Sequence, residues 1–116
     1  MKKIEIAFIG GSGLYKIPNL KKIEWIEVKT NFGKPSSNIC LGKLNNKEIA
    51  FLPRHGMDHN ISPSKINYQA NIESLKKIGV QNIISLSAVG SLRDDYKPGD
   101  FVIVDQFIDK TYLRKK

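Results

Sequence analysis

The sequence predicts an α/β fold with a partly parallel sheet, and two observations lead to this prediction. Three short apolar runs, at residues 4–9, 82–89 and 101–104, have the length and the β-branched content of buried strands. A helical pattern separates a further strand, predicted at residues 48–52, from the run at 82–89. Strand, helix and strand in this order form a βαβ unit, so these two strands should be parallel.

The first strand should cover residues 4–9, and it runs directly into Gly10-Gly11-Ser12-Gly13. This pattern is typical of a buried strand that enters a glycine turn. Residues 24–29 alternate imperfectly between apolar and polar side chains, which predicts an edge strand.

A hairpin should follow, because residues 37–44 and 48–52 flank Asn45-Asn46-Lys47. Asparagine tolerates the positive φ that a tight hairpin turn requires. The second strand of this hairpin should end at Pro53-Arg54-His55-Gly56, before a polar loop.

The helix should begin at Ser62-Pro63-Ser64, which places a hydroxyl cap before a proline in the first turn. Tyr68, Ile72 and Leu75 lie three or four residues apart and predict one face of this helix. Gly79 lies on the same face and should form the carboxyl-terminal cap.

The last two strands, at residues 82–89 and 101–104, should be covered on both faces, as continuous apolar runs usually are. The first should stop at Gly90, and the second should follow the turn residues Pro98-Gly99-Asp100. We detect no linker and no internal repeat, so the 116 residues should belong to a single domain.

Composition excludes several classes of protein. Apolar residues make up 41% and charged residues 26% of the chain, which fits an ordinary soluble domain. No apolar stretch approaches the length that a membrane-spanning helix needs. The single cysteine, Cys40, excludes an intrachain disulfide and a multi-thiolate metal site. Met1-Lys2-Lys3 imitates a signal peptide, but Glu5 and the glycines after Ile9 interrupt the apolar core, so we expect a cytoplasmic protein. The net charge of +8 comes from scattered lysines, which favours a solvated surface over nucleic-acid binding.

Chemistry should concentrate where the predicted strands end, at residues 10–13, 53–56 and 87–91. In open α/β sheets, ligands bind beyond the carboxyl ends of the strands. If the three strands are parallel neighbours, their ends combine backbone N–H groups, a guanidinium, an imidazole and hydroxyls. Those groups together suit an anion.

Each motif taken singly leaves an alternative open. Gly11 and Gly13 begin a dinucleotide-binding pattern, but Lys16 occupies the third glycine position, so a turn without a ligand is equally consistent. Arg54 and His55 could bind phosphate through a bidentate fork and a further donor, or could be a surface arginine and a structural histidine. His55 and His59 are four residues apart in a polar loop without a complete ligand set, so we expect no metal.

The ordered set of motifs points to a family. It comprises Ile9-Gly10-Gly11-Ser12-Gly13-Leu14, Asn31-Phe32-Gly33-Lys34-Pro35-Ser36, Arg54-His55-Gly56, residues 63–72, Ser87-Ala88-Val89-Gly90-Ser91-Leu92-Arg93, residues 98–103 and residues 105–111. Over nearly its whole length the chain resembles the methylthioadenosine phosphorylases of the trimeric purine nucleoside phosphorylase family. The resemblance implies an α/β phosphorylase/hydrolase-like sandwich with a mixed, partly closed β-sheet flanked by helices.

The resemblance also implies the reaction, in which phosphate and methylthioadenosine give adenine and methylthioribose 1-phosphate. The resemblance implies no organic cofactor and no metal. Inorganic phosphate is expected as a co-substrate. The partners should be a small-molecule nucleoside and phosphate, with no nucleic acid and no membrane, and the assembly should be a homotrimer.

Residue by residue, the family's phosphate contacts fall on Ser12, Arg54, His55, Ser87 and Ala88, the last through its backbone. Ala88 should also let the substrate approach the strand end. Members often have threonine where Ser12 and Ser87 stand, which keeps the hydroxyl. Asn31 occupies a position where proline is common.

Family members are much longer than this chain, so residues 1–116 should be the amino-terminal part of a single nucleoside phosphorylase domain. The base-recognising carboxylates belong to the other part, and therefore no catalytic residue is identified here. A broader purine nucleoside phosphorylase and a methylthioinosine phosphorylase remain as alternative enzymes. An inactive piece that only binds anions or a partner remains as an alternative of another class.

Overall fold

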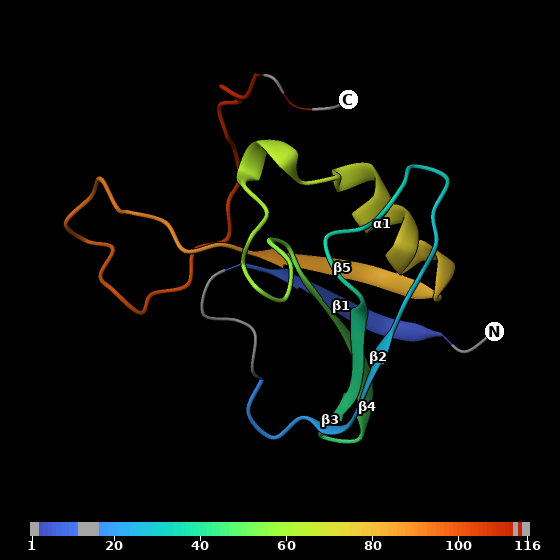
Figure 1. Ribbon diagram of the computed structural model, residues 1–116. Helices are drawn as coiled ribbons and strands as arrows, with labels where there is room; N and C mark the ends of the chain where they lie inside the picture. Colours follow the sequence, from blue (N-terminus) through green and yellow to red (C-terminus); the bar gives the residue numbers. More distant parts are fainter. Residues whose placement is uncertain (1–2, 12–16, 113, 115–116) are drawn as a thin grey trace.

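The computed structural model describes residues 3–11, 17–112 and 114 (Figure 1). Within them one mixed sheet has the strand order β2-β3-β4-β1-β5, with a single α-helix on one side. The elements are β1 (Ile4–Gly10), β2 (Lys21–Ile26), β3 (Ile39–Leu44), β4 (Lys47–Pro53), a 3₁₀ turn η1 (Pro63–Lys65), α1 (Tyr68–Lys77) and β5 (Val80–Leu86).

The βαβ prediction is confirmed, because β4, α1 and β5 follow one another and both strands run parallel to β1, which lies between them. The other half of the sheet is antiparallel, from β2 through β3 to β4. The predicted hairpin joins β3 to β4, and Asn45 and Asn46 have φ values of 50° and 65°. Asparagine is one of the few residues that adopt this left-handed conformation readily.

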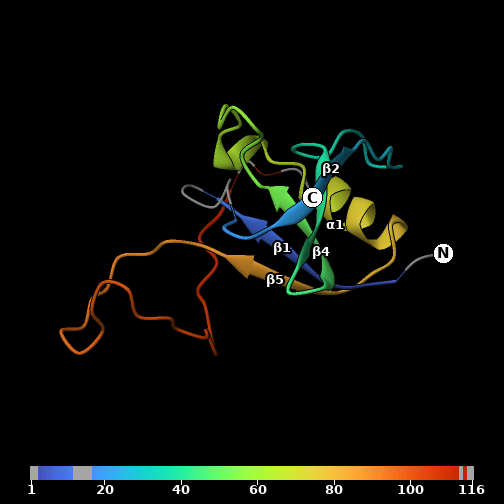
Figure 2. The same cartoon turned by 90° about the horizontal axis from the view of Figure 1, so that it is seen from below.

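The core lies between one face of the sheet and α1, and Figures 1 and 2 both place the helix on a single side of the sheet. Its buried members are Ile4, Ala7, Ile9, Ile39, Ala50, Leu52 and Leu75. They come from β1, β3, β4 and α1, so burial of these apolar side chains holds the parallel strands in register beneath the helix.

The helix begins later than the sequence predicted. Residues Ser62-Pro63-Ser64 start the 3₁₀ turn η1, and the chain is extended at Ile66 before α1 begins. The cap of α1 is Asn67, whose side-chain Oδ1 accepts the N–H of Ala70 at 3.0 Å. The predicted end is confirmed: Gly79 follows α1 with a φ of 91°, and its N–H donates to the carbonyl of Lys76 at 3.0 Å.

The predicted apolar face of the helix is only partly right. Leu75 is fully buried, but Ile72 is 49% exposed and lines an open groove of about 770 Å³ with Phe32. The buried face instead includes Asn71 and Ser74. These polar side chains can be buried because both have hydrogen-bond partners, as Asn71 contacts Ser36 at 3.0 Å and Ser74 Oγ donates to the Asn71 carbonyl at 2.8 Å.

The two carboxyl-terminal strand predictions need correction. The strand predicted at residues 82–89 lies at Val80–Leu86, and Ile83 is 40% exposed instead of covered. The strand predicted at 101–104 is wrong, because this segment has no regular secondary structure and Phe101 is 94% exposed. The physical reason is that β5 is the last strand of the described sheet, so nothing supplies the neighbouring hydrogen bonds and covering side chains that the apolar pattern requires.

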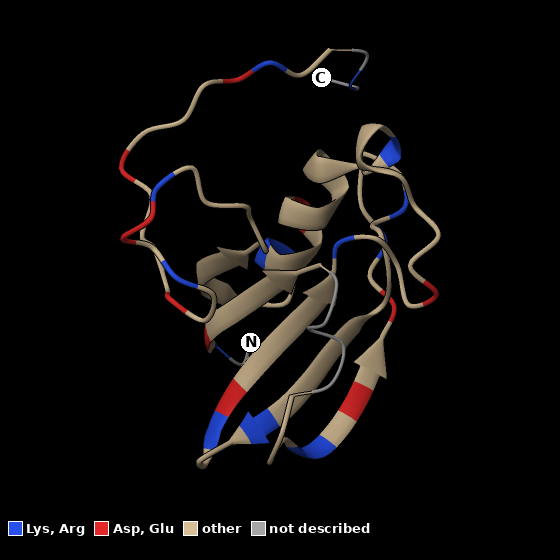
Figure 3. Ribbon diagram, turned by 90° about the vertical axis from the view of Figure 1, so that its left-hand side faces the viewer, with Lys and Arg blue, Asp and Glu red and all other residues tan. Residues whose placement is uncertain are grey.

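In the view of Figure 3, both basic and acidic residues are scattered over the strands and loops. Lys47 and Glu5, for example, approach to 3.9 Å on the exposed surface. This mixing agrees with a solvated charged surface. Over the described parts of the chain, no helix has the length and apolar character needed to span a bilayer.

Candidate active site at the ends of the parallel strands

The carboxyl ends of β1, β4 and β5 lie side by side, as the sequence predicted. In the sheet register Gly10 is opposite Pro53 of β4 on one side and opposite Leu86 of β5 on the other. Arg54 and Ser87, which follow those two strand ends, therefore leave the sheet at the same edge. This convergence brings together residues from three distant parts of the sequence.

Arg54, which follows β4, forms hydrogen bonds to the ends of both β1 and β5. Its backbone N–H donates to the Gly10 carbonyl at 2.8 Å, and its Nη1 donates to the Leu86 carbonyl at 3.2 Å. The side chain is half-buried. A guanidinium carries several N–H donors in a planar fork, and a single contact to a carbonyl leaves it able to bind a phosphate or carboxylate as well.

Gly11 is buried against this guanidinium. A Cβ atom at Gly11 would lie 2.5 Å from Nη2 of Arg54 and 3.6 Å from Cδ2 of His55. Only glycine allows the chain to pass this close without moving the arginine. The glycine turn thus has a structural reason that its motif did not reveal, namely the space that Arg54 occupies.

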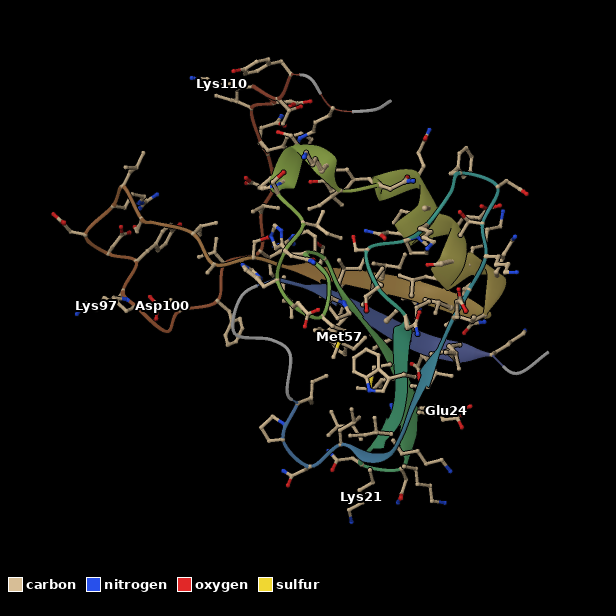
Figure 4. All side chains as sticks on the ribbon, viewed as in Figure 1. Lys21, Glu24, Met57, Lys97, Asp100 and Lys110 are labelled. Carbon is tan, nitrogen blue, oxygen red and sulfur yellow. The ribbon has the colours of Figure 1, made fainter. Side chains whose placement is uncertain are left out.

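The imidazole of His55 is held by the loop that follows it. Its Nδ1–H donates to the carbonyl of Ile61 at 2.8 Å, and the N–H of Ile61 donates to the His55 carbonyl at 3.1 Å. The ring also contacts His59, with 4.8 Å between the ring centroids. In Figure 4, the label of Met57 marks the loop between these two histidines. These hydrogen bonds fix the orientation of the His55 ring.

The remaining predicted contacts differ in how far the structure describes them. Ser87 and Ala88 follow β5 directly, are exposed and have no regular secondary structure. Ser12 lies outside the described residues. Sequence reasoning missed the carbonyls of Leu86 and Ile61, which orient Arg54 and His55. No residue-type signal could have found them, because every residue carries a carbonyl.

The comparison with known families decides where this chain belongs. The family model described as the phosphorylase superfamily matches residues 5–116. The chain belongs to the phosphorylase superfamily.

Individual relatives within the superfamily are close. The S-methyl-5′-thioadenosine phosphorylase of Saccharolobus solfataricus is 57% identical over 114 residues, which are 98% of this chain and 42% of that protein. The S-methyl-5′-thioadenosine phosphorylase of Thermofilum pendens is 53% identical over 111 residues, which are 96% of this chain and 42% of that protein. The chain therefore spans less than half the length of these curated relatives.

Solved structures in the superfamily share the fold. The methylthioadenosine phosphorylase of Schistosoma mansoni, solved in complex with adenine, superposes with a TM-score of 0.88 and 43% identity, over 97% of this chain and 39% of that one. The mixed-sheet phosphorylase fold and the sequence resemblance are both confirmed.

The loop before β3 is joined to α1 through Asn31, at the position where the family resemblance led us to expect proline. Its backbone N–H donates to Oε2 of Glu73 at 2.7 Å, and its Nδ2 donates to Oε1 at 3.0 Å. Three further hydrogen bonds join this loop to α1 and its cap. Asn67 Nδ2 donates to the Phe32 carbonyl at 2.7 Å, and the Ser36 N–H donates to Asn71 Oδ1 at 2.8 Å. Lys77 Nζ donates to the Lys29 carbonyl at 2.9 Å. A proline at position 31 could make neither Asn31 bond, so asparagine here provides a clamp on the helix.

Within residues 3–11, 17–112 and 114, no three His, Cys, Asp or Glu side chains are grouped so that they could hold a metal ion. The lone thiol, Cys40, is buried in β3 between β2 and β4, and burial raises its pKa. A buried thiol with a raised pKa is largely protonated, so it is a poor nucleophile and a poor metal ligand.

Proposed function

We propose that residues 1–116 are the amino-terminal part of an S-methyl-5′-thioadenosine phosphorylase. The enzyme would transfer the methylthioribosyl group of methylthioadenosine from adenine to inorganic phosphate. The high identity to two proteins of that name and the fold shared with a third support this assignment. The convergence of three parallel strand ends on Arg54 is the observation in this chain that carries it.

The chemistry of the reaction suits such a site. A phosphate oxygen attacks C1′ of the sugar, the bond from C1′ to the purine nitrogen breaks, and the purine leaves with a proton. Because phosphate is itself the nucleophile, the protein needs no nucleophilic side chain. It needs a fixed set of donors that holds the anion beneath C1′, and positioning of this kind supplies a large part of many rate enhancements.

The residues at the strand ends would share this task. Arg54 would hold the phosphate through its guanidinium, with His55 beside it. Ser12 and Ser87 would contribute hydroxyl donors, and Ala88 would contribute its backbone N–H while leaving room for the sugar. The group that protonates the purine would lie outside residues 1–116.

The remaining properties of the intact protein follow from the same proposal. Inorganic phosphate would be the only co-substrate, with no organic cofactor or metal. The intact protein would form a homotrimer in the cytoplasm, as the resemblance to the trimeric family implies. Sedimentation equilibrium of the full-length protein measures its oligomeric state.

Adenosine is a second candidate substrate. One of the solved structures that share this fold, at 42% identity, is described as an adenosine/methylthioadenosine phosphorylase from Schistosoma mansoni. Comparing kcat/KM for methylthioadenosine, adenosine, inosine and methylthioinosine separates the broader purine nucleoside phosphorylase and the methylthioinosine enzyme from the proposed one.

The decisive activity assay measures adenine release from methylthioadenosine by the full-length protein, with and without phosphate. We expect release only with phosphate, and methylthioribose 1-phosphate as the second product. Release of free methylthioribose at an equal rate without phosphate would identify a hydrolase instead. Absence of release under both conditions would favour the alternative of an anion-binding remnant.

A further inference from the structure

Asn71 of α1 is a polar side chain in the interior of the protein. It is 2% exposed, and both ends of its amide are bonded to one residue outside the helix, Ser36. Oδ1 accepts the backbone N–H of Ser36 at 2.8 Å, and Nδ2 donates to Ser36 Oγ at 3.0 Å. Burying an amide is unfavourable unless its polar atoms are paired, so this pairing favours a single position of Ser36 relative to the helix.

The carbonyl of Ser36 lies close to the turn that follows β4. A Cβ atom at Gly56 would be 3.3 Å from the Ser36 carbonyl oxygen, which is closer than ordinary van der Waals contact. Gly56 is buried and has a φ of 83°, a conformation in which a side chain would be strained. Glycine at this position therefore allows the turn to pack directly against the loop that Asn71 holds.

The same turn carries the arginine of the candidate site. The N–H of Gly56 donates to the carbonyl of Pro53 at 3.2 Å, which closes the turn that contains Arg54. On one side, the backbone N–H of Arg54 is bonded to Gly10 of β1 at 2.8 Å. On the other side, the turn packs against Ser36. The position of Arg54 thus depends on the loop before β3 as well as on the sheet.

We propose that Asn71 is a positioning residue for phosphate binding and that it acts through Ser36 and the turn containing Arg54. This inference rests on the proposed function. Asn71 itself would touch neither phosphate nor nucleoside. Its amide fixes Ser36, and Ser36 limits how far the turn at Gly56 can shift, so the guanidinium stays where the parallel strands end. Small displacements of a group that holds a reactant slow a reaction, because catalysis depends on the geometry of the bound state.

The test measures the KM for phosphate, kcat and the melting temperature of the full-length protein and its variants. Asn71→Leu keeps the approximate size of the side chain but removes both bonds to Ser36. We expect it to raise the KM for phosphate about three- to ten-fold, as substitutions that act on a site through intervening residues do. The KM for methylthioadenosine should change less. A purely structural role would lower the melting temperature and the amount of folded enzyme, and hence the apparent kcat, but would leave the KM for phosphate unchanged.

A conservative variant and a matched control separate positioning from stability. In Asn71→Asp, the carboxyl oxygens can accept both the N–H and the hydroxyl of Ser36, so the KM for phosphate should stay close to the wild-type value. Ser74→Ala is the control, because Ser74 is also fully buried in α1 but its Oγ donates to the Asn71 carbonyl within the helix, at 2.8 Å. This variant should lower the melting temperature without changing the KM for phosphate.

A second pair of variants tests the same contact from the loop and serves if Asn71→Leu does not fold. Ser36→Ala removes only the hydroxyl partner of Asn71, so the KM for phosphate should rise about two-fold, the lower end for a neutral hydrogen bond. Ser37→Ala is its control, since Ser37 Oγ is buried without a hydrogen-bond partner among the described residues. This control should leave the KM for phosphate unchanged.

Several results would overturn the proposal and leave the phosphorylase assignment in place. The first is an unchanged KM for phosphate in Asn71→Leu or, if that variant does not fold, in Ser36→Ala. The second is an equal rise in Ser74→Ala, because general loosening of α1 would then explain the effect. The third is a KM as high in Asn71→Asp as in Asn71→Leu. A wild-type protein without phosphate-dependent release of adenine would instead refute the proposed function.

Discussion

Residues 3–86 and residues 87–112 both contain apolar runs, but they have different structures. The described part of the first region forms the sheet and α1, and its core side chains are buried. The second region contains no helix or strand, and Figure 1 shows it leaving the end of β5 as a wide projecting loop that turns back before the chain passes the 3₁₀ turn η1. Phe101 is 94% exposed, although its run is as apolar as β1.

The difference lies in the partners that each region finds. The backbone groups of β1 form parallel-sheet hydrogen bonds with β4 and with β5. In contrast, the hydrogen bonds described within residues 87–112 join residues that are at most three positions apart in the sequence. Arg93 and Asp95 form one such local pair at 2.6 Å, and this contact holds the pKa of the Asp95 carboxyl below its ordinary value. The turn at Lys97 and Asp100 lies far out on the projecting loop in Figure 4. An apolar pattern therefore predicts burial only where a neighbouring element exists to provide it.

The largest expected effect separates the two regions by stability. In the chain of residues 1–116, Leu75→Ala should lower the free energy of unfolding by about 2–5 kcal/mol, because Leu75 is fully buried against the sheet. Phe101→Ala is the matched control and should change it by less than about 0.5 kcal/mol. Urea denaturation monitored by circular dichroism measures both. Equal destabilisation by the two variants would mean that residues 87–112 are packed into the same core.

A smaller effect concerns the end of β1. Gly11→Ala should displace the guanidinium of Arg54, because the new Cβ would lie 2.5 Å from Nη2. We expect phosphate binding by the full-length protein to weaken by about 1.5–3 kcal/mol, the value of a hydrogen bond to a charged group. A double-mutant cycle with Arg54→Ala is the control. If Gly11→Ala weakens binding equally in the Arg54→Ala background, the substitution acts through something other than the guanidinium.

The smallest effect concerns the clamp between Asn31 and α1. Glu73→Gln replaces one acceptor oxygen with an amide donor, which cannot receive both hydrogen bonds from Asn31. The free energy of unfolding should fall by about 0.5–1.5 kcal/mol, since the contact is exposed. Glu24→Gln on edge strand β2 makes the same change and should have no effect beyond about 0.5 kcal/mol. Thermal melts of both variants, compared at one pH, measure the difference, and equal melting temperatures would argue against the clamp.

Local signals in the sequence were sufficient for part of this fold and part of the candidate site. Asn45-Asn46 predicted the hairpin and Gly79 the end of α1, because each position requires a backbone conformation that few residues adopt. The meeting of Arg54, His55 and Ser87 at one edge followed from the parallel arrangement of a βαβ unit.

Other features depended on contacts between distant residues. The start of α1 was predicted too early, because Asn67 caps the helix more effectively than the Ser62-Pro63 pair. The burial of Asn71 could not be predicted either, since it depends on Ser36, which is distant in the sequence. The orientation of the His55 ring likewise depends on one backbone carbonyl, that of Ile61.

The central claim is that Arg54, where the ends of β1, β4 and β5 meet, binds phosphate, and one measurement tests it most directly. The KM for phosphate is determined for the full-length protein, for Arg54→Ala and for Arg93→Ala, whose arginine pairs with Asp95 in the second region. We expect Arg54→Ala to raise this KM and to lower kcat/KM at least ten-fold, corresponding to the loss of about 1.5–3 kcal/mol. Arg93→Ala should leave the phosphate dependence unchanged. An unchanged phosphate dependence in Arg54→Ala would contradict the account.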